Sequence, residues 1–131
     1  MNTGIFVLNF APVLGGVIAD CVITTNNYGI TLNAPGYLVT GNEIAYNSSA
    51  AILIQSSNHR IDGNHIAVAA GSSGIQLTSP ANYTNNVIVR NSVYGGASAA
   101  VNYNIIGTTQ NDVGPIGNAS TNTSPWANIS H

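Results

Sequence analysis

The stretch VTGNEIAYNSSAAILIQSSNHRIDGNHIA, residues 39–67, contains one six-residue pattern twice. VTGNEI at residues 39–44 returns as IDGNHI at residues 61–66, 22 residues later. Each copy places apolar residues around a Gly-Asn pair, and both Gly and Asn tolerate the left-handed backbone that a tight turn requires. A repeat at this interval predicts a solenoid, in which every coil packs against the next.

A second pattern alternates with the first: a small residue, an apolar residue, any residue and another apolar residue. It occurs at residues 4–7, 29–32, 51–54, 74–77 and 100–103. Weaker copies of the Gly-Asn pattern occur at residues 18–23 and 88–93. Alternating apolar residues indicate strands with one buried face. The chain is therefore expected to be all-β: a single domain over residues 1–131, with a parallel β-helix of about four to five coils over residues 4–103 and an irregular tail or cap over residues 104–131.

Stacked coils also predict a ladder of asparagine side chains at one bend. Equivalent residues of adjacent coils lie about 4.7–4.9 Å apart, so Asn42, Asn64 and Asn91 are expected to stack. Cys21 occupies the fourth place in this row, where a small thiol can end the ladder. Cys21 is the only cysteine of the chain, which excludes an internal disulfide.

Charged residues make up only 5% of the 131-residue chain, against about 25% in ordinary soluble proteins. Arg60 and Arg90 are the only cations of fixed charge and the net charge is −2, which argues against nucleic-acid binding. No apolar run approaches the ~20 residues of a membrane-spanning helix. The start of the chain has no Lys or Arg and so lacks the charged n-region of a signal peptide. Either export uses another route or the chain is a piece of a longer β-helix.

With VTGNEI, IDGNHI and the three stacked asparagines, the chain resembles right-handed parallel β-helix proteins of the pectate-lyase-like superfamily, among them bacterial surface proteins and phage tailspikes. The resemblance implies that the β-helix is right-handed. It also implies a location outside the cell or on a cell or virion surface. It also implies a polysaccharide-binding groove on the strand of the small-apolar pattern. The outward-facing residues of that strand are expected to be Phe6, Thr31, Leu53, Gln76 and Asn102.

None of these side chains can act as a general acid, base or nucleophile of the usual kind, and no carboxylates face each other across the groove. Enzymes of the family place acidic residues or an arginine there, so the sequence predicts a non-catalytic glycan-binding or structural module without a metal or other cofactor. Thr31, Gln76 and Asn102 are the expected hydrogen-bonding residues. Leu53 and Tyr83 are the expected apolar contacts.

Two aromatic residues outside the groove strand have two interpretations each. Tyr83, in the turn TSPANYTNN, either contacts a sugar or is an ordinary exposed turn residue. Trp126, the only tryptophan, either stacks on a sugar ring or anchors the tail against the coils. The second interpretation of Trp126 is favoured, because tryptophans are largely buried.

The alternative function is that of a polysaccharide lyase or glycoside hydrolase, with Glu43, His65, Asp62 and Arg60 as the reactive cluster. Arg60 and Asp62 lie two residues apart on one strand, so both are expected to point outward. Glu43 and His65 take equivalent places in adjacent coils and should nearly touch, with His59 at the neighbouring turn. A cluster of surface ion pairs explains the same residues and is favoured, because such pairs are common on protein surfaces.

The ends of a solenoid need caps, because end coils expose apolar core and unpaired strand edges. Here the chain enters a strand at residue 4 with no amphipathic helix before it. Phe6 and Leu53 also point outward on the groove face, with only Thr31 between them. These features predict a homo-oligomer.

Overall fold

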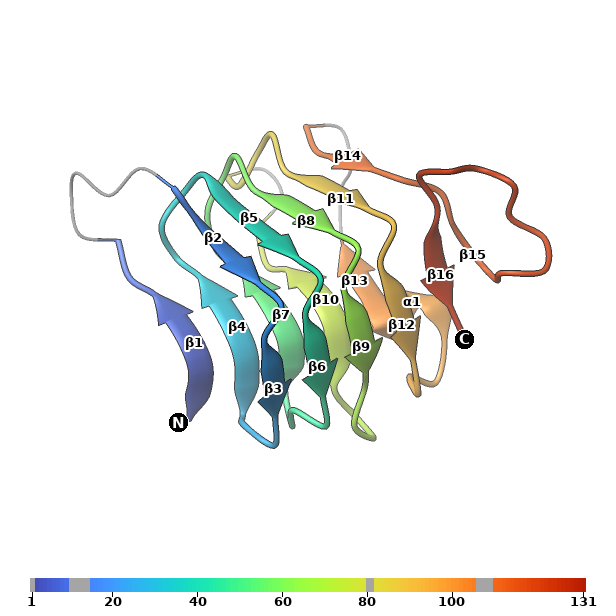
Figure 1. Ribbon diagram of the computed structural model, residues 1–131, viewed down its shortest axis with the longest axis horizontal. Coiled ribbons are helices and arrows are strands. Elements are labelled where there is room, and N and C mark those ends of the chain that lie inside the picture. The colour runs from blue at the N-terminus through green and yellow to red at the C-terminus, as the bar shows by residue number, and fades with distance from the viewer. Residues whose placement is uncertain (1, 10–14, 80–81, 106–109) are drawn as a thin grey trace.

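The computed structural model describes residues 2–9, 15–79, 82–105 and 110–131. The chain winds repeatedly through three sheets, here named A, B and C, and forms a solenoid with its termini at opposite ends (Figure 1). All pairings between the described strands are parallel. The predicted all-β parallel β-helix is confirmed.

The three sheets contain equivalent strands of successive coils. Sheet A, formed by the small-apolar pattern, has the order β1 (Thr3–Val7), β4 (Tyr28–Leu32), β7 (Ala50–Ile54), β10 (Ser73–Leu77) and β13 (Tyr103–Ile105). Sheet B has the order β14 (Asp112–Val113), β11 (Val87–Val89), β8 (Arg60–Asp62), β5 (Tyr37–Thr40) and β2 (Gly16–Ala19). Sheet C has the order β15 (Ile116–Gly117), β16 (Asn128–Ser130), β12 (Ser92–Tyr94), β9 (His65–Ala67), β6 (Glu43–Ala45) and β3 (Val22–Thr24).

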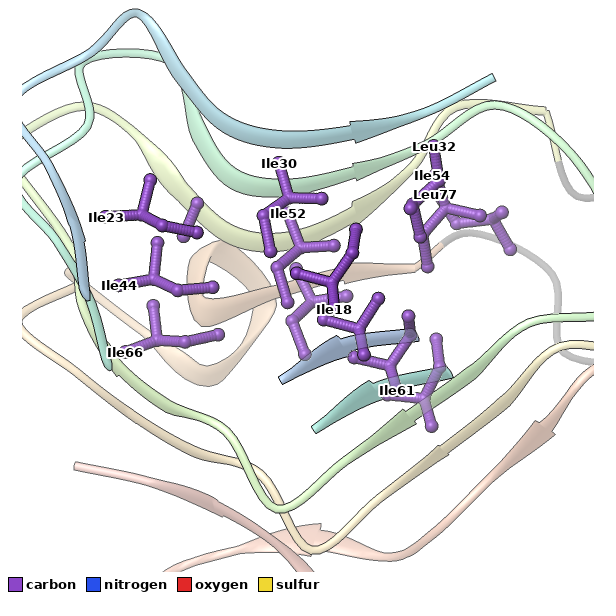
Figure 2. Packing of buried hydrophobic residues seen from close by; sticks show 14 of the residues in the cluster. Ile18, Ile23, Ile30, Leu32, Ile44, Ile52, Ile54, Ile61, Ile66 and Leu77 are labelled. Atoms are coloured by element: carbon purple, nitrogen blue, oxygen red, sulfur yellow. The ribbon is translucent and has the colours of Figure 1, made fainter. Parts of the chain in front are cut away.

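The core lies between the three sheets and consists of rows of similar apolar residues, one from each coil (Figure 2). In sheet A, Ile30 pairs with Ile52, which in turn pairs with Ile75, and all three are fully buried. Burial of one such side chain stabilises the fold by about 1.5–3 kcal/mol. The alternation seen in the sequence is therefore the alternation of inward and outward side chains.

The small residue that begins the sheet A pattern lies where sheets A and C approach each other closely. A Cβ atom on Gly29 would lie 2.5 Å from the backbone oxygen of Ala51 and 2.8 Å from Ile44 Cγ2. Gly4 and Gly74 are enclosed in the same way. A larger side chain would overpack the core here, so close packing accounts for this part of the repeat.

The bend between sheets B and C requires a left-handed backbone. Gly41 and Gly63 provide it with φ angles of 64° and 67°. Asp20 and Arg90 take the equivalent places in the outer coils with φ angles of 55° and 57°. A residue with a Cβ atom in this conformation costs about 1–2 kcal/mol, so Arg90 must be held there by other contacts.

The last coil differs from the sequence prediction by two residues. Tyr103 is the sheet A partner of Ile75, two positions later than predicted. The preceding residues form a single helical turn, α1 (Ala99–Asn102). The prediction that Asn102 lies on the groove strand is therefore wrong, and Asn104 takes its place. A shift of two residues preserves the alternation of inward and outward positions along the strand, which hides the error from a pattern of period two.

The tail is more regular than the sequence indicates. β14 joins sheet B, while β15 and β16 join sheet C, so the tail continues two of the three sheets. Within the described ranges, no helix has the length and apolar character needed to cross a bilayer.

Candidate functional site

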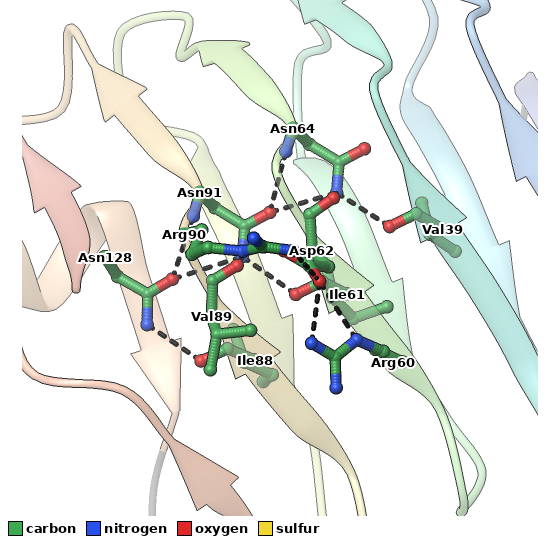
Figure 3. A network of polar contacts seen from close by, with 10 residues as sticks. All are labelled: Val39, Arg60, Ile61, Asp62, Asn64, Ile88, Val89, Arg90, Asn91 and Asn128. Carbon is green, nitrogen blue, oxygen red and sulfur yellow. Dashed lines mark hydrogen bonds and ion pairs between the residues drawn. The ribbon is translucent and has the colours of Figure 1, made fainter. Parts of the chain in front are cut away.

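The asparagine ladder is confirmed and is longer than predicted (Figure 3). Asn64 Oδ1 accepts hydrogen bonds from Nδ2 and the backbone N of Asn42, at 2.9 and 3.1 Å. Asn91 Oδ1 accepts the same two bonds from Asn64, at 2.9 and 3.0 Å. Asn128 Oδ1 accepts them from Asn91, at 3.1 Å each, and so adds an unpredicted member. At the other end, Cys21 takes the expected place beside Asn42 and donates its backbone N–H to Asn42 Oδ1 at 3.0 Å, while its Sγ donates to the carbonyl oxygen of Ala19.

Next to this ladder, Asp62 is enclosed by both arginines of the chain (Figure 3). Arg90 donates from Nε and Nη2 at 2.7 and 2.6 Å, and Arg60 donates from Nε at 2.9 Å. The hydrogen bonds from Arg90 contribute most to a pKa of Asp62 below its usual range, against the opposing effect of desolvation. A carboxylate held in this way stays ionised at neutral pH and is a poor general acid.

Glu43 and His65 touch, as the sequence predicts. His65 Nδ1 lies 2.7 Å from Glu43 Oε2, and both side chains are about half exposed on the outer face of sheet C. Asp62 and Arg60 belong instead to sheet B, on the other side of the bend. The predicted four-residue cluster is therefore two separate ion-pair groups. Among the described residues, no three His, Cys, Asp or Glu side chains gather as a metal site requires.

His59 is buried and fully occupied by structural hydrogen bonds. Its Nδ1 accepts from the backbone N of Tyr37 at 3.1 Å, so the ring proton lies on Nε2. Nε2 is 2.7 Å from Ser56 Oγ, which donates in turn to the carbonyl oxygen of Leu32. Burial lowers the pKa of His59 to about 4. His59 is therefore neutral at physiological pH and unsuited to acid catalysis.

The outer face of sheet A carries the predicted row of residues. Phe6 pairs with Thr31, Thr31 with Leu53, and Leu53 with Gln76. A hollow of about 430 Å³, here named the sheet A hollow, lies over one end of this row. Its lining residues are Thr3, Phe6, Tyr28, Thr31, Leu53 and Gln55.

The predicted ligand-binding residues differ in their relation to the sheet A hollow. Thr31 and Leu53 form part of it, although they are only 4% and 6% exposed. Gln76 does not line it and lies farther along the row. Tyr83 lies in a turn outside the sheet and is partly buried against the core. Asn102 is buried and donates from Nδ2 to Ser130 Oγ at 2.8 Å, so its predicted role in ligand binding is wrong.

Two aromatic residues of the sheet A hollow were absent from the predicted binding residues. Phe6 is 50% exposed at the edge of the sheet, and Tyr28 is partly exposed just before Gly29. The sequence does contain one indication of the position of Tyr28. Tyr28 directly precedes Gly29, the small inward-facing residue that begins the sheet A pattern. One polar atom of the lining, Thr31 Oγ1, is buried and has no hydrogen-bond partner within the part of the chain that the structure describes.

The three parallel sheets, the stacked apolar rows and the asparagine ladder define a parallel β-solenoid. The chain belongs to the right-handed beta helix region family, whose model matches residues 1–118. Comparison with curated proteins and with solved structures finds no match.

Proposed function

We propose that this chain is a non-catalytic module that binds a glycan in the sheet A hollow. The observation that carries the proposal is the lining itself, in which two aromatic rings, Phe6 and Tyr28, stand beside uncharged polar groups. A sugar ring has apolar C–H faces that pack on aromatic rings and hydroxyls that pair with neutral polar side chains. The volume of about 430 Å³ falls in the range of about 300–1,000 Å³ typical of small-molecule sites.

The absence of catalysis is supported by where the ionisable groups lie. Among the residues that the structure describes, no carboxylate and no histidine lines the sheet A hollow. Asp62 is engaged by both arginines on sheet B, and the pair Glu43–His65 lies on sheet C. Hydrolysis of a glycoside by the usual route needs two carboxyl groups facing one bond, which this lining does not offer.

Phe6→Ala is expected to weaken glycan binding about tenfold, equivalent to about 1.4 kcal/mol, because it removes one of the two aromatic rings among the described lining residues of the sheet A hollow. Affinity electrophoresis through gels that contain neutral or acidic polysaccharides measures the change, and the chain length of the polymer is determined afterwards. Tyr46→Asn is the matched control, since Tyr46 is an exposed aromatic residue elsewhere and Asn tolerates its φ of 54°.

Retardation of the wild-type protein without shortening of the polymer supports the proposal. Shortened polymer contradicts it and directs attention to Glu43 and His65. Absence of retardation in every gel, or equal loss in the Phe6 and Tyr46 variants, contradicts the assignment of the sheet A hollow.

Self-association is a second candidate role, in which the chain acts as a structural module. β1, β2 and β3 are the terminal strands of the three sheets at one end of the solenoid. On these strands Val17 and Val22 are 67% and 77% exposed. Exposed strand edges that carry apolar side chains favour pairing with another chain. Both proposed roles fit a location outside the cell or on a cell or virion surface.

We expect the wild-type protein to form a homo-oligomer, and Val22→Lys to shift it toward the monomer. The introduced charge is costly to bury in an interface and discourages edge pairing. Light scattering coupled to size-exclusion chromatography measures the mass of both proteins over a range of concentrations. A wild-type protein that stays monomeric at every concentration contradicts this role.

A further inference from the structure

A second hollow, here named the sheet B hollow, lies on the outer face of sheet B and has a volume of about 370 Å³. Strands β8, β11 and β14 form its floor, and the tail residues that follow β14 form its wall. Its lining residues are Arg60, Val87, Val89, Asp112, Val113, Gly114, Pro115, Ser124 and Trp126. It shares no lining residue with the sheet A hollow.

Trp126 stands in this wall with 52% of its surface exposed, so the expectation that it is largely buried is wrong. The guanidinium carbon of Arg90 lies 5.5 Å from the centroid of the indole ring. The electron-rich face of the indole attracts the cation electrostatically. Arg90 is itself fixed by two hydrogen bonds to Asp62. The indole is therefore held by a positioned cation while much of its surface stays accessible.

The backbone that carries Trp126 is also fixed. Asn128, two residues later, donates from Nδ2 to the carbonyl oxygens of Ile88 and Gly114 at 2.8 and 3.2 Å. Its backbone N donates to the carbonyl oxygen of Pro115 at 2.8 Å. The last member of the asparagine ladder thus attaches the wall of the sheet B hollow to its floor, and a preorganised aromatic platform loses little entropy when a ligand binds.

The charges around the sheet B hollow cancel. Arg60 and Arg90 supply two positive charges, and Asp62 and Asp112 supply two negative ones. Arg60 and Asp112 are both lining residues, one with planar N–H donors and the other with acceptor oxygens. Val87 and Val89 give the floor an apolar surface. An aromatic platform, an apolar floor, a donor and an acceptor with no net charge suit a neutral polyhydroxylated ring better than an anion.

We propose that the sheet B hollow binds a neutral pyranose unit. The C–H face of the sugar packs on Trp126, while its hydroxyls donate to Asp112 and accept from Arg60. The site is separate from the sheet A hollow and does not depend on it. If both sites are occupied, one chain holds a glycan at two places on different sheets, which raises its avidity for a long polymer.

The single tryptophan allows a direct test, because Trp126 is the only indole of the chain. Its fluorescence is followed while cellohexaose, mannohexaose or maltohexaose is added to the full chain. We expect a saturable change with at least one of these neutral probes. Asp112→Ala, a change at an exposed residue, is expected to weaken that binding at least tenfold.

Phe6→Ala is the matched variant for the sheet A hollow and should leave the fluorescence titration unchanged. A fluorescence change that disappears in Phe6→Ala reports the other site and overturns this proposal. Absence of a saturable change with all three hexasaccharides also overturns it. Tighter binding of hexagalacturonate, the acidic probe of equal length, would overturn the assignment to a neutral sugar.

Discussion

Asn64→Ala is expected to lower the free energy of unfolding by about 3–6 kcal/mol, which is a large part of the ~5–15 kcal/mol typical of folded proteins. Asn64 Oδ1 accepts both hydrogen bonds from Asn42, and Nδ2 donates to the carbonyl oxygen of Val39 at 3.0 Å and to Asn91 Oδ1 at 2.9 Å. Alanine leaves two donors of Asn42 and the carbonyl of Val39 without these partners in a buried bend. Each buried polar group without a partner costs about 1–3 kcal/mol.

Urea denaturation followed by circular dichroism measures this difference. Asn104→Ala is the matched control, because Asn104 is a partly exposed asparagine on the outer face of sheet A. The control is expected to stay within about 0.5 kcal/mol of the wild-type protein. A loss below about 1 kcal/mol for Asn64→Ala would show that the ladder is no stronger than an ordinary hydrogen bond.

Lowering the pH from 6.5 to 4 is expected to reduce the free energy of unfolding by about 3 kcal/mol through His59 alone. The pKa of His59 is lowered from 6.5 to about 4 by burial, so between these values the unfolded chain binds a proton that the folded chain excludes. The unfolded state therefore binds more protons, and stability falls as the pH falls through this window. Protonation of Nδ1 would set an N–H group against the backbone N–H of Tyr37, which is the structural reason for the loss.

The His59→Gln variant is expected to be less stable than the wild-type protein at pH 7. Its free energy of unfolding should no longer show the decrease between pH 6.5 and 4 that His59 causes. His65→Gln, at an exposed histidine of sheet C, should retain it. The contribution of Asp62 falls mainly below this window, because a carboxylate with a lowered pKa loses most of its stabilising effect as the pH falls through and below its ordinary pKa of 3.8. Thermal unfolding at intervals of half a pH unit distinguishes these cases, and a flat wild-type profile from pH 6.5 to 4.5 contradicts the prediction.

The regular coils were predictable from sequence because their contacts repeat at a fixed interval. The 22-residue interval alone predicts that Asn42 and Asn64 lie in one row and that Glu43 lies next to His65, and the Gly-Asn pattern adds Asn91 to the row. The repeat interval and the alternation of apolar residues gave no correct prediction where the chain leaves the repeat. Asn128 follows Asn91 by 37 residues and has no preceding glycine, so only the structure shows that the tail returns to complete the ladder.

The candidate sites were less predictable than the fold, because they depend on contacts between different rows. Nothing in the alternation indicates that Thr31 and Leu53 are covered while Phe6 is half exposed. The average burial of tryptophan was a poor guide to Trp126, because its partner is the cation of Arg90 and not the apolar core. The single-turn helix that displaced Asn102 also had no signal in a period-two pattern.

The ladder has a consequence for how such a chain can change its length. Residues 42–63 form one coil that starts at a ladder asparagine and ends just before the next, so a tandem gene duplication of this segment would add one rung of about 4.8 Å and leave both ends unchanged. Ile44 and Ile61 would each meet a copy of themselves in the interior, as isoleucines already do there. Glu43, Arg60 and Asp62 would each meet an identical charge. The present chain avoids that repulsion, because the following coil places His65 beside Glu43, Val87 beside Arg60 and Val89 beside Asp62. The interior therefore sets no upper limit on the number of coils, and the charges on the outside decide whether a duplicated coil is tolerated.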